Sequence, residues 1–397
     1  MGRSTGIRCE ARPCPPQARA GGPAIPRTRR ALALALVAAA LAAGCGGDDD
    51  PSSARGDDPT ATTARPGDGA GGTGTSGDLV PGAEARQLGP SDGPGVPSDG
   101  CRTDTPGDQV AKERHELDGI DDDEGAARWY LLTAPAGTEP VPLVVDFHGL
   151  SEGAEIHSLM SEMGELGLEQ GFATAFPNGT GQPVAWEVLA EGVDSPELPY
   201  VDALLDDVLA ARCIDTSRVY ATGLSNGAMM TSMLACTRAD RFAAFAPVAG
   251  LSTWDGCQPR RPVPILAFHG TADPILYFNG GIGDLSIVTG GEAPESVEVP
   301  EADLDGEGYP ETARQWAAFN GCDPEASDEE LTEEILDRTW RCPAGAPVEL
   351  VIVVGGGHSW PGSEFSKQIE RIVGPTTDDI AASEAMWEFF QRYQLPA

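Results

Sequence analysis

Hydrophobic and polar positions along residues 101–397 alternate in a way that predicts strands and helices in turn. Short continuous apolar runs, such as Val141 to Phe147, are typical of strands whose two faces are both covered. The strand pattern recurs in eight segments: Arg114 to Ile120, Ala127 to Thr133, Val141 to Phe147, Phe172 to Phe176, Arg218 to Thr222, Phe242 to Val248, Val263 to Phe268 and Val348 to Val354. Helical spacing is found between them, in Ala154 to Glu169, Tyr200 to Cys213, Ala228 to Arg238, Glu311 to Asn320 and Asp379 to Tyr393. Strands interleaved with helices predict an α/β domain, with a mostly parallel eight-stranded sheet and helices on both faces.

The first 44 residues carry a different pattern. Arginines precede the apolar run Ala31 to Ala43, which is too short to span a bilayer as a helix. This arrangement predicts a signal peptide over residues 1–44. The run ends in Leu-Ala-Ala-Gly-Cys45, which resembles the lipobox of bacterial lipoproteins and predicts that Cys45 carries a lipid anchor. A plain secretory signal followed by a stray cysteine is the alternative interpretation.

Residues 45–100 consist mainly of Gly, Asp, Pro, Ser and Thr, with almost no apolar positions. Such a segment cannot bury enough surface to offset the entropy lost on ordering, so it is predicted to be a disordered tether. The composition changes at Cys101. Residues 101–397 are therefore predicted to form one domain, which the tether holds clear of a membrane.

The chain is strongly acidic, with 62 acidic and 26 basic residues, and residues 1–44 hold seven of the arginines but only one acidic residue. Removal of that segment leaves 61 acidic and 19 basic residues, a net charge of −42. A field of this sign repels phosphate backbones and anionic lipids, which excludes nucleic acid as a partner and limits membrane contact to the lipid anchor. The cysteines are too far apart and the five histidines too few for a zinc site, so no metal or other cofactor is expected.

Three serines stand in a Gly-x-Ser-x-Gly pattern, which is typical of a nucleophile elbow between a strand and a helix. With 50 glycines in the chain, chance matches are expected. Ser91 lies in a proline-rich and glycine-rich run without a strand, and Ser151 follows only the third predicted strand. Ser225 follows the fifth predicted strand and precedes a helix, which is the position of the nucleophile in an α/β-hydrolase. An ordinary strand-to-helix turn at Ser225 is the alternative.

Two further motifs supply the partners that a nucleophilic serine needs. The seventh predicted strand ends in HGTADP, which contains Asp273, and the eighth ends in GGGHSWPG, which contains His358. Serine, acid and histidine thus occur in the chain order of an α/β-hydrolase triad. We expect His358 to take the proton from Ser225 and return it to a leaving alcohol, while Asp273 holds the imidazole.

The oxyanion hole of this fold is built from two backbone N–H groups, one after the nucleophile and one in the loop after the third strand. These positions correspond to Asn226 and Leu150, the latter following the string VVDFHG. His148 in that string is expected to have a structural role. His115 and His157 precede the serine in contexts that do not suit a catalytic base.

The strings RVYATGLSNGAMM, HGTADPI and GGGHSWPG together resemble the bacterial polyhydroxybutyrate depolymerase and feruloyl or acetylxylan esterase group of secreted lipoprotein esterases. The resemblance extends over roughly Cys101 to Tyr393. It implies a serine carboxylic-ester hydrolase with Ser225, Asp273 and His358 as its triad. The chain departs from the group after the fourth strand, where Ala-Trp186-Glu replaces a tryptophan-asparagine pair and no paired cysteines occur.

Six cysteines follow Cys45, an even number that predicts three disulfides in an exported protein. Sequence alone leaves fifteen pairings open. Nearness of the predicted elements and the family resemblance favour Cys101–Cys213, Cys236–Cys257 and Cys322–Cys342. Buried free thiols are the alternative.

Some 35 residues rich in Gly, Pro, Asp and Glu separate Asp273 from the helix predicted at Glu311. A loop this long is usually functional, and its acidity favours neutral esters. We expect acetyl or aryl-acyl sugar esters as substrates, and 3-hydroxybutyrate oligomers after them, for a monomer anchored at the outer face of a bacterial membrane. A solvated surface loop, a serine peptidase of the same fold, and a catalytically silent surface-binding lipoprotein are the competing interpretations.

Overall fold

The structure is a computed structural model that describes residues 86–87, 95–102, 107–188, 193–286, 288–289, 297–343 and 345–395. The predicted signal peptide, Cys45 and most of the predicted tether lie outside the described residues. The described part of residues 45–100 contacts the domain: β1 (Arg86–Gln87) pairs with β12 (Tyr393–Gln394), and the Val96 N–H donates to the Asp215 carboxylate at 2.8 Å. The folded domain therefore begins before Cys101, where composition placed its start.

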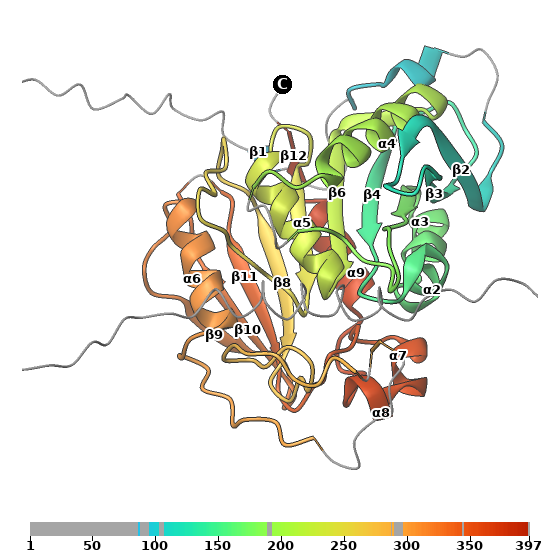
Figure 1. The fold of residues 1–397 in the computed structure, drawn as a ribbon. Coiled ribbons are helices and arrows are strands. Elements are labelled where there is room, and N and C mark those ends of the chain that lie inside the picture. The colour runs from blue at the N-terminus through green and yellow to red at the C-terminus, as the bar shows by residue number, and fades with distance from the viewer. Residues whose placement is uncertain are drawn as a thin grey trace, which may run out of the picture. The chain divides into compact units, whose positions relative to one another are not determined.

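A ten-stranded sheet forms the centre of the domain, in the order β2-β3-β5-β4-β6-β7-β8-β11-β10-β9 (Figure 1). Its strands are β2 (Val110–Asp121), β3 (Ala127–Ala134), β4 (Val141–Phe147), β5 (Ala173–Pro177), β6 (Ile214–Leu224), β7 (Ala244–Val248), β8 (Ile265–Gly270), β9 (Ser327–Glu330), β10 (Ile335–Trp340) and β11 (Val348–Val353). The six strands from β5 to β11 in this order run parallel to one another. The strands outside them pair antiparallel.

All eight predicted strands are present, but the prediction of an eight-stranded sheet was too small by two. Strands β9 and β10 form a hairpin that pairs antiparallel to β11 at the edge of the sheet. Every residue of β9, with the sequence SDEE, is exposed. A strand without apolar positions has no hydrophobic period, so the sequence pattern did not reveal β9. Strand β10 was missed as well, although its Ile335 and Trp340 are buried.

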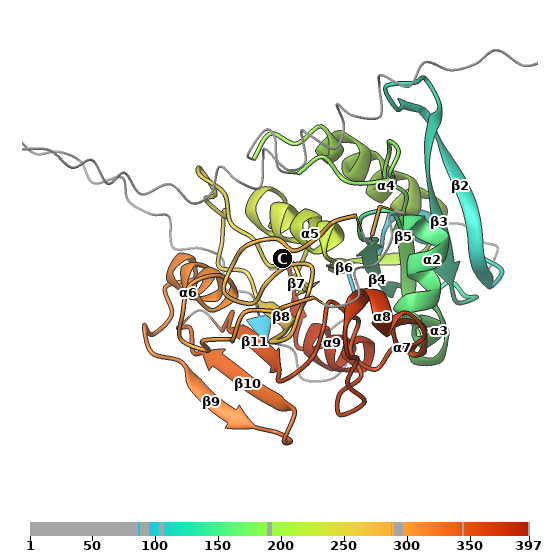
Figure 2. The same cartoon turned by 60° about the horizontal axis from the view of Figure 1, so that its bottom comes forward.

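Helices cover both faces of the sheet. The α-helices are α2 (Gly153–Met160), α3 (Met163–Gln170), α4 (Glu197–Ala211), α5 (Asn226–Thr237), α6 (Tyr309–Phe319), α7 (Glu364–Gln368), α8 (Glu370–Val373) and α9 (Ala382–Phe390). Figure 2 shows α4, α5 and α6 along one side of the sheet and α9 on the other side. Helix α3 contacts α9. The single helix predicted over Ala154 to Glu169 is broken between α2 and α3, because Glu162 has a φ of 51°.

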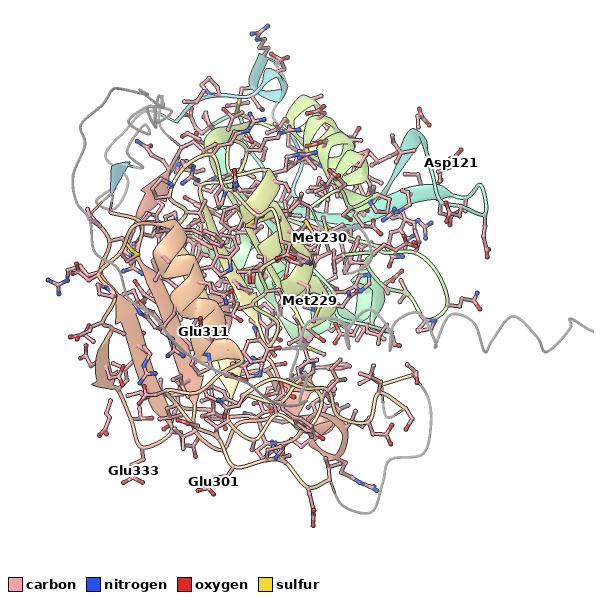
Figure 3. The ribbon with its side chains drawn as sticks, turned by 60° about the vertical axis from the view of Figure 1, so that its left-hand side comes forward. Asp121, Met229, Met230, Glu301, Glu311 and Glu333 are labelled. Carbon is pink, nitrogen blue, oxygen red and sulfur yellow. A yellow bond between two sulfur atoms is a disulfide. The ribbon has the colours of Figure 1, made fainter. Side chains whose placement is uncertain are left out.

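The parallel strands and α5 make up the most deeply buried part of the molecule. Every residue of β5, β7 and β8 is buried. Helix α5 is buried on all sides, including Met229 and Met230, which Figure 3 labels. Because close-packed interiors permit little movement, the residues that follow these strands are attached to a rigid part of the structure.

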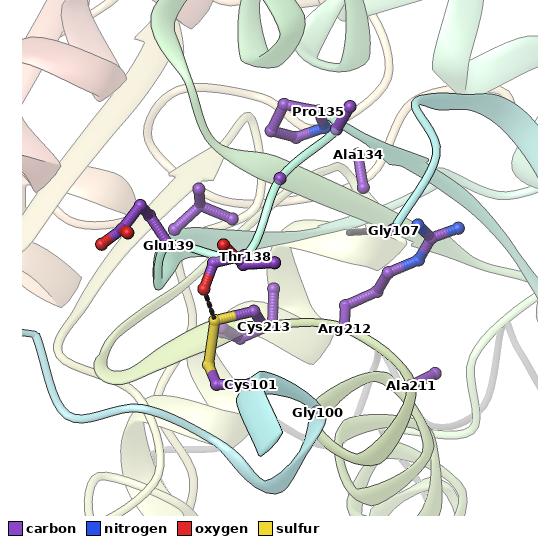
Figure 4. A pocket seen from close by; sticks show the side chains of 14 residues that line it. Gly100, Cys101, Gly107, Ala134, Pro135, Thr138, Glu139, Ala211, Arg212 and Cys213 are labelled. Atoms are coloured by element: carbon purple, nitrogen blue, oxygen red, sulfur yellow. Dashed lines mark hydrogen bonds between the residues drawn. A yellow bond between two sulfur atoms is a disulfide. The ribbon is translucent and has the colours of Figure 1, made fainter. Parts of the chain in front are cut away.

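Three disulfides are formed, with the pairings favoured above: Cys101–Cys213, Cys236–Cys257 and Cys322–Cys342. The first joins η1 (Asp99–Arg102) to the start of β6. A cavity of about 320 Å³ lies beside this bond. Figure 4 shows Thr138 and Arg212 among the residues that line it. This cavity lies at the amino ends of β4 and β6, at the opposite end of β6 from Ser225. Within the described ranges, no helix has the length and apolar character needed to cross a membrane.

Candidate active site

Ser225 stands on a sharp turn between β6 and α5, as the elbow motif predicts. Its backbone has φ 57° and ψ −117°, a conformation that is strained for a residue with a side chain. Two hydrogen bonds hold the strained residue. Its N–H donates to the Val248 carbonyl oxygen at 2.9 Å, and its own carbonyl oxygen accepts from the Met229 N–H at 3.0 Å. The turn is thus tied to the end of β7 and to the first turn of α5.

The two glycines of the elbow allow it to pack against the end of β4. A Cβ atom at Gly223 would lie 2.6 Å from the Phe147 carbonyl oxygen, and one at Gly227 would lie 2.1 Å from the same atom. Both distances are too short for any side chain. The glycines are therefore required by the neighbouring strand, and they bring Ser225 next to the loop that follows Phe147.

Asp273 and His358 come together from the ends of β8 and β11. The His358 Nδ1 donates to the Asp273 Oδ2 at 2.7 Å, and both side chains are buried. The Asp273 Oδ1 accepts from the N–H groups of Ile275 and Leu276, each at 2.8 Å. Burial alone would raise the pKa of Asp273, but the neighbouring His358 and His269 hold it well below its ordinary value. The aspartate is therefore ionised and fixed in orientation.

The hydrogen bond to Asp273 determines which nitrogen of His358 is free. Because a carboxylate only accepts, Nδ1 carries the proton and Nε2 is available as a base. Within the described ranges, neither the His358 Nε2 nor the Ser225 Oγ has a hydrogen-bond partner. Both groups lie at the carboxyl edge of the sheet, and each is free to exchange a proton.

His269 is a second histidine on the same aspartate, and sequence reasoning missed it. Its Nε2 lies 2.9 Å from the Leu276 carbonyl oxygen and 3.3 Å from the Asp273 Oδ2. Its ring stacks on Tyr309 with centroids 3.5 Å apart. His269 opens the HGTADP motif and stands four positions before Asp273, which is a signal that the sequence already contained. It supports the acid and does not itself occupy the position of the base.

The two predicted oxyanion donors have unused N–H groups. Three other N–H groups in the loop after β4 have acceptors. The Gly149 N–H donates to the Glu152 Oε2. The Ser151 N–H donates to the Val184 carbonyl oxygen, and the Glu152 N–H donates to the Gly149 carbonyl oxygen. The Leu150 N–H has no acceptor among the residues that the structure describes. The same holds for the Asn226 N–H, which begins α5. Unpaired N–H groups at these positions are what an oxyanion hole requires.

Trp186 connects the two halves of this candidate oxyanion hole. Its backbone N–H donates to the Asn226 Oδ1 at 2.7 Å, and the Asn226 Nδ2 donates back to the Trp186 oxygen at 3.1 Å. Its indole Nε1 donates to the His148 oxygen at 2.8 Å. The buried tryptophan therefore joins the elbow to the loop after β4, a function that the sequence analysis did not assign to it.

His148 has the structural role expected of it. Its ring donates from Nδ1 to the Gly149 oxygen at 2.7 Å and accepts the Gly179 N–H at Nε2, at 2.8 Å. Burial lowers the pKa of His148 to about 4. The ring is neutral near pH 7 with both nitrogens engaged by backbone, so it has no free position for proton transfer.

The second motif, around Ser151, is followed by a helix whose histidine cannot serve as its base. The histidine of the following helix, His157, lies 2.8 Å from Asp146 through Nε2 and 3.2 Å from Glu152 through Nδ1. Burial alone would lower the pKa of His157, but the two carboxylates raise it to about 10. A histidine protonated on both nitrogens cannot take a proton from serine, which agrees with the choice of Ser225.

The order of these elements defines a class of protein. A serine elbow after β6, an aspartate after β8 and a histidine after β11, on this strand order, constitute the α/β-hydrolase fold. The model of the prolyl oligopeptidase family matches residues 165–261, a segment that includes the elbow and less than half of the chain. In the described part of the chain, no group of three or more His, Cys, Asp or Glu side chains is placed to hold a metal ion.

Within that class, the chain is similar to curated esterases. Feruloyl esterase B of Piromyces equi is 30% identical over 232 residues, which are 56% of this chain and 40% of that protein. The putative esterase NocK of Nocardia uniformis subsp. tsuyamanensis is 28% identical over 283 residues, 67% of this chain and 79% of that protein. The bifunctional acetylxylan esterase/xylanase XynS20E of Neocallimastix patriciarum is 29% identical over 157 residues, 39% and 23% of the two chains. The chain thus resembles the feruloyl and acetylxylan esterase group, and it spans less than half of the first of these relatives.

Proposed function

We propose that this protein is a serine carboxylic-ester hydrolase that acts through an acyl-enzyme. The observation that carries this proposal is the 2.7 Å bond between the His358 Nδ1 and the Asp273 Oδ2, which leaves Nε2 as the base at the carboxyl edge where Ser225 stands. Ser225 Oγ attacks the ester carbonyl carbon while its proton passes to His358, and the carbonyl oxygen becomes an oxyanion near the N–H groups of Asn226 and Leu150. The imidazolium then gives its proton to the leaving alcohol. Water repeats the sequence and releases the acid.

The substrates that we propose are neutral sugar esters of acetyl or feruloyl groups, with 3-hydroxybutyrate oligomers as the second class. The names of the similar esterases support the first class. The segment between β8 and α6 supports neutrality, because six of its described acidic residues are exposed: Asp284, Glu298, Glu301, Asp303, Asp305 and Glu307. Figure 3 shows Glu301 extending outward from this segment. Such a field repels anionic esters during approach.

The segment between β8 and α6 is held at its base. The Asn279 Nδ2 donates to the carbonyl oxygens of Asp303 and Glu307 at 2.7 and 3.0 Å, and the Asp303 N–H donates back to the Asn279 Oδ1. Arg338 on β10 pairs with Asp305 at 3.0 Å. Asn279 is thus joined to residues 303–307, and Asp305 to the edge hairpin, which supports a fixed place for these described residues of the segment.

Three disulfides indicate an oxidising compartment outside the cytoplasm. We propose that the protein is a monomer, held at the outer face of the bacterial membrane by lipid on Cys45. Cys45→Ser should then release the protein from the membrane or block its processing. Unchanged membrane partitioning of Cys45→Ser would contradict the anchor.

A fluorophosphonate probe and a substrate panel test the activity. We expect the probe to label wild-type protein and to spare Ser225→Ala. The panel contains short p-nitrophenyl esters, methyl ferulate, acetylated xylo-oligomers and hydroxybutyrate oligomers, with polymer granules for contrast. The highest kcat/KM is expected on acetyl or feruloyl esters. Absence of both labelling and hydrolysis would instead support a catalytically silent scaffold.

A serine peptidase is the second candidate, because the prolyl oligopeptidase family model matches the elbow region. The same triad chemistry cleaves amides, so geometry at Ser225 does not separate the two activities. Peptide p-nitroanilides added to the panel make the distinction. A kcat/KM on any peptide above that on every ester would favour the peptidase.

A further inference from the structure

A buried ionic network lies behind the loop that carries Leu150. His157 on α2 is fully buried and contacts two carboxylates, Asp146 on β4 at 2.8 Å and Glu152 at 3.2 Å. The same Glu152 Oε2 accepts the Gly149 N–H at 2.7 Å. One carboxylate oxygen therefore joins a charged histidine to the backbone of the loop.

The network acts on a short and strained segment. Ser151, which follows Leu150, has a φ of 71°, a conformation that a residue with a side chain adopts only when its surroundings enforce it. A Cβ atom at Gly149 would lie 3.1 Å from the Glu152 carboxylate, so the loop and the carboxylate are in close contact. The Leu150 peptide lies between two residues that are both held, one by Glu152 and one by the Val184 oxygen at 2.8 Å.

The charges in the network favour a stable arrangement. Burial alone would raise the pKa of Glu152, but the hydrogen bond and charge of His157 hold it below its ordinary value. Glu152 therefore stays ionised, and an ionised oxygen makes a stronger acceptor for the Gly149 N–H than a neutral one. Asp146 is fully buried and balances the second proton of His157. None of the described hydrogen bonds or ion pairs joins the network directly to Asp273 or His358, and the His157 ring meets Trp360, two positions after His358, edge to face with centroids 5.5 Å apart.

We propose that Glu152, held by His157, which Asp146 holds in turn, is a positioning residue that sets the Leu150 N–H for the oxyanion. This inference rests on the proposed esterase activity, because an oxyanion forms only if Ser225 attacks a carbonyl. Glu152 touches the loop backbone and acts through it. A displacement of the donor by about 1 Å reduces turnover by about a hundredfold, and loss of one oxyanion donor costs about 10² to 10³ in kcat.

The test compares three variants with wild type on p-nitrophenyl acetate. Glu152→Ala removes the acceptor of the Gly149 N–H and should lower kcat about 10- to 100-fold while KM changes by less than about twofold. Glu152→Gln keeps an oxygen acceptor and should recover kcat to within about threefold of wild type. Glu155→Ala removes an exposed carboxylate from the first turn of α2, the helix that Glu152 precedes, and should leave kcat and KM unchanged. Titration of Ser225 with fluorophosphonate counts the folded active sites, so that kcat refers to folded enzyme alone.

A trifluoromethyl ketone provides a readout that folding does not affect. The Ser225 Oγ adds to the ketone carbon, the carbonyl electron pair moves onto oxygen, and the serine proton passes to His358, so the product places an oxyanion against the loop. Its inhibition constant should rise in Glu152→Ala by the same factor as kcat falls, and should return toward wild type in Glu152→Gln. Unchanged kcat and inhibition in Glu152→Ala, with full labelling of Ser225, would overturn this inference alone. A wild-type protein that neither reacts with fluorophosphonate nor hydrolyses any ester would overturn the proposed function, and this inference with it.

Discussion

Two histidine–aspartate pairs stand at the same edge of this sheet, and their chemistry is opposite. His358 contacts Asp273 at 2.7 Å and His157 contacts Asp146 at 2.8 Å, so the two pairs are nearly equal in length. Each pair can be matched with a serine in a Gly-x-Ser-x-Gly motif: Ser151 lies between Asp146 and His157 in the sequence, and Ser225 precedes both Asp273 and His358. Motif and pair geometry alone would give the site two candidates.

The second nitrogen of each histidine makes the difference. In His358 the Nε2 has no hydrogen-bond partner within the described ranges, whereas the Nδ1 of His157 meets a second carboxylate, Glu152. One aspartate orients a ring whose second nitrogen is free, and two carboxylates hold an imidazolium whose pKa is raised to about 10. A histidine–carboxylate pair therefore identifies a catalytic base only when the other ring nitrogen is free.

Substitution of the serines and of His358 gives the largest expected contrast. Ser225→Ala or His358→Ala should each lower kcat by about 10⁴ to 10⁶, because serine and histidine act as a unit. Ser151→Ala should remain within about threefold of wild type. Ester hydrolysis by purified variants measures both, and covalent labelling of Ser151 instead of Ser225 would contradict the assignment.

Substitution of the two aspartates should separate turnover from stability. Asp273→Asn offers the His358 Nδ1 an N–H instead of an acceptor, which favours the wrong tautomer and should lower kcat by about 10³ to 10⁴. Asp146→Asn weakens a buried ion pair and should lower the free energy of unfolding by about 3 kcal/mol. Urea unfolding and kcat per titrated active site measure the two effects. If Asp146→Asn lost more turnover than Asp273→Asn, the two pairs would have been assigned in reverse.

The charge on His157 predicts a loss of stability in alkaline solution. Its pKa is raised from 6.5 to about 10 in the folded protein, so the folded state keeps a proton that the unfolded state has released. The stability from this group is complete below pH 6.5 and falls by about 1.4 kcal/mol per pH unit until the pH passes about 10. The NMR chemical shift of the His157 Cε1 proton should change with a midpoint near pH 10. Titration of His157 near pH 6.5 would contradict the ionic network.

His148 predicts the smaller and opposite effect, on the acid side. Burial lowers the pKa of His148 from 6.5 to about 4. Between these two pH values the unfolded state binds a proton on His148 that the folded state does not bind. Stability should fall by about 1.4 kcal/mol per pH unit as the pH drops from 6.5 to about 4. Urea unfolding of wild type and His148→Gln across this window should show the shallower slope in the variant. Equal slopes would show that His148 does not titrate as a buried neutral ring.

Most strands and helices could be predicted from the sequence, because burial of an element produces a recognisable pattern of apolar positions. All eight predicted segments are strands, and those that are buried throughout, β5, β7 and β8, are continuous apolar runs because both of their faces are covered. Strand β9 was not predicted, because all its residues are polar and exposed at the sheet edge. The break between α2 and α3 was also missed, because apolar spacing does not record the left-handed backbone of Glu162.

The sequence by itself determined the order of serine, aspartate and histidine and the glycines of the elbow, because these are local motifs at strand ends. Only the tertiary structure decided which histidine keeps a free nitrogen. His358 and Asp273 are 85 positions apart, and the Trp186 contact with Asn226 spans 40. Which of these distant residues meet depends on how the chain between them folds. The protonation state of a histidine depends on every charge that folding brings within a few ångströms, which is why two similar motifs in one chain have opposite chemistry.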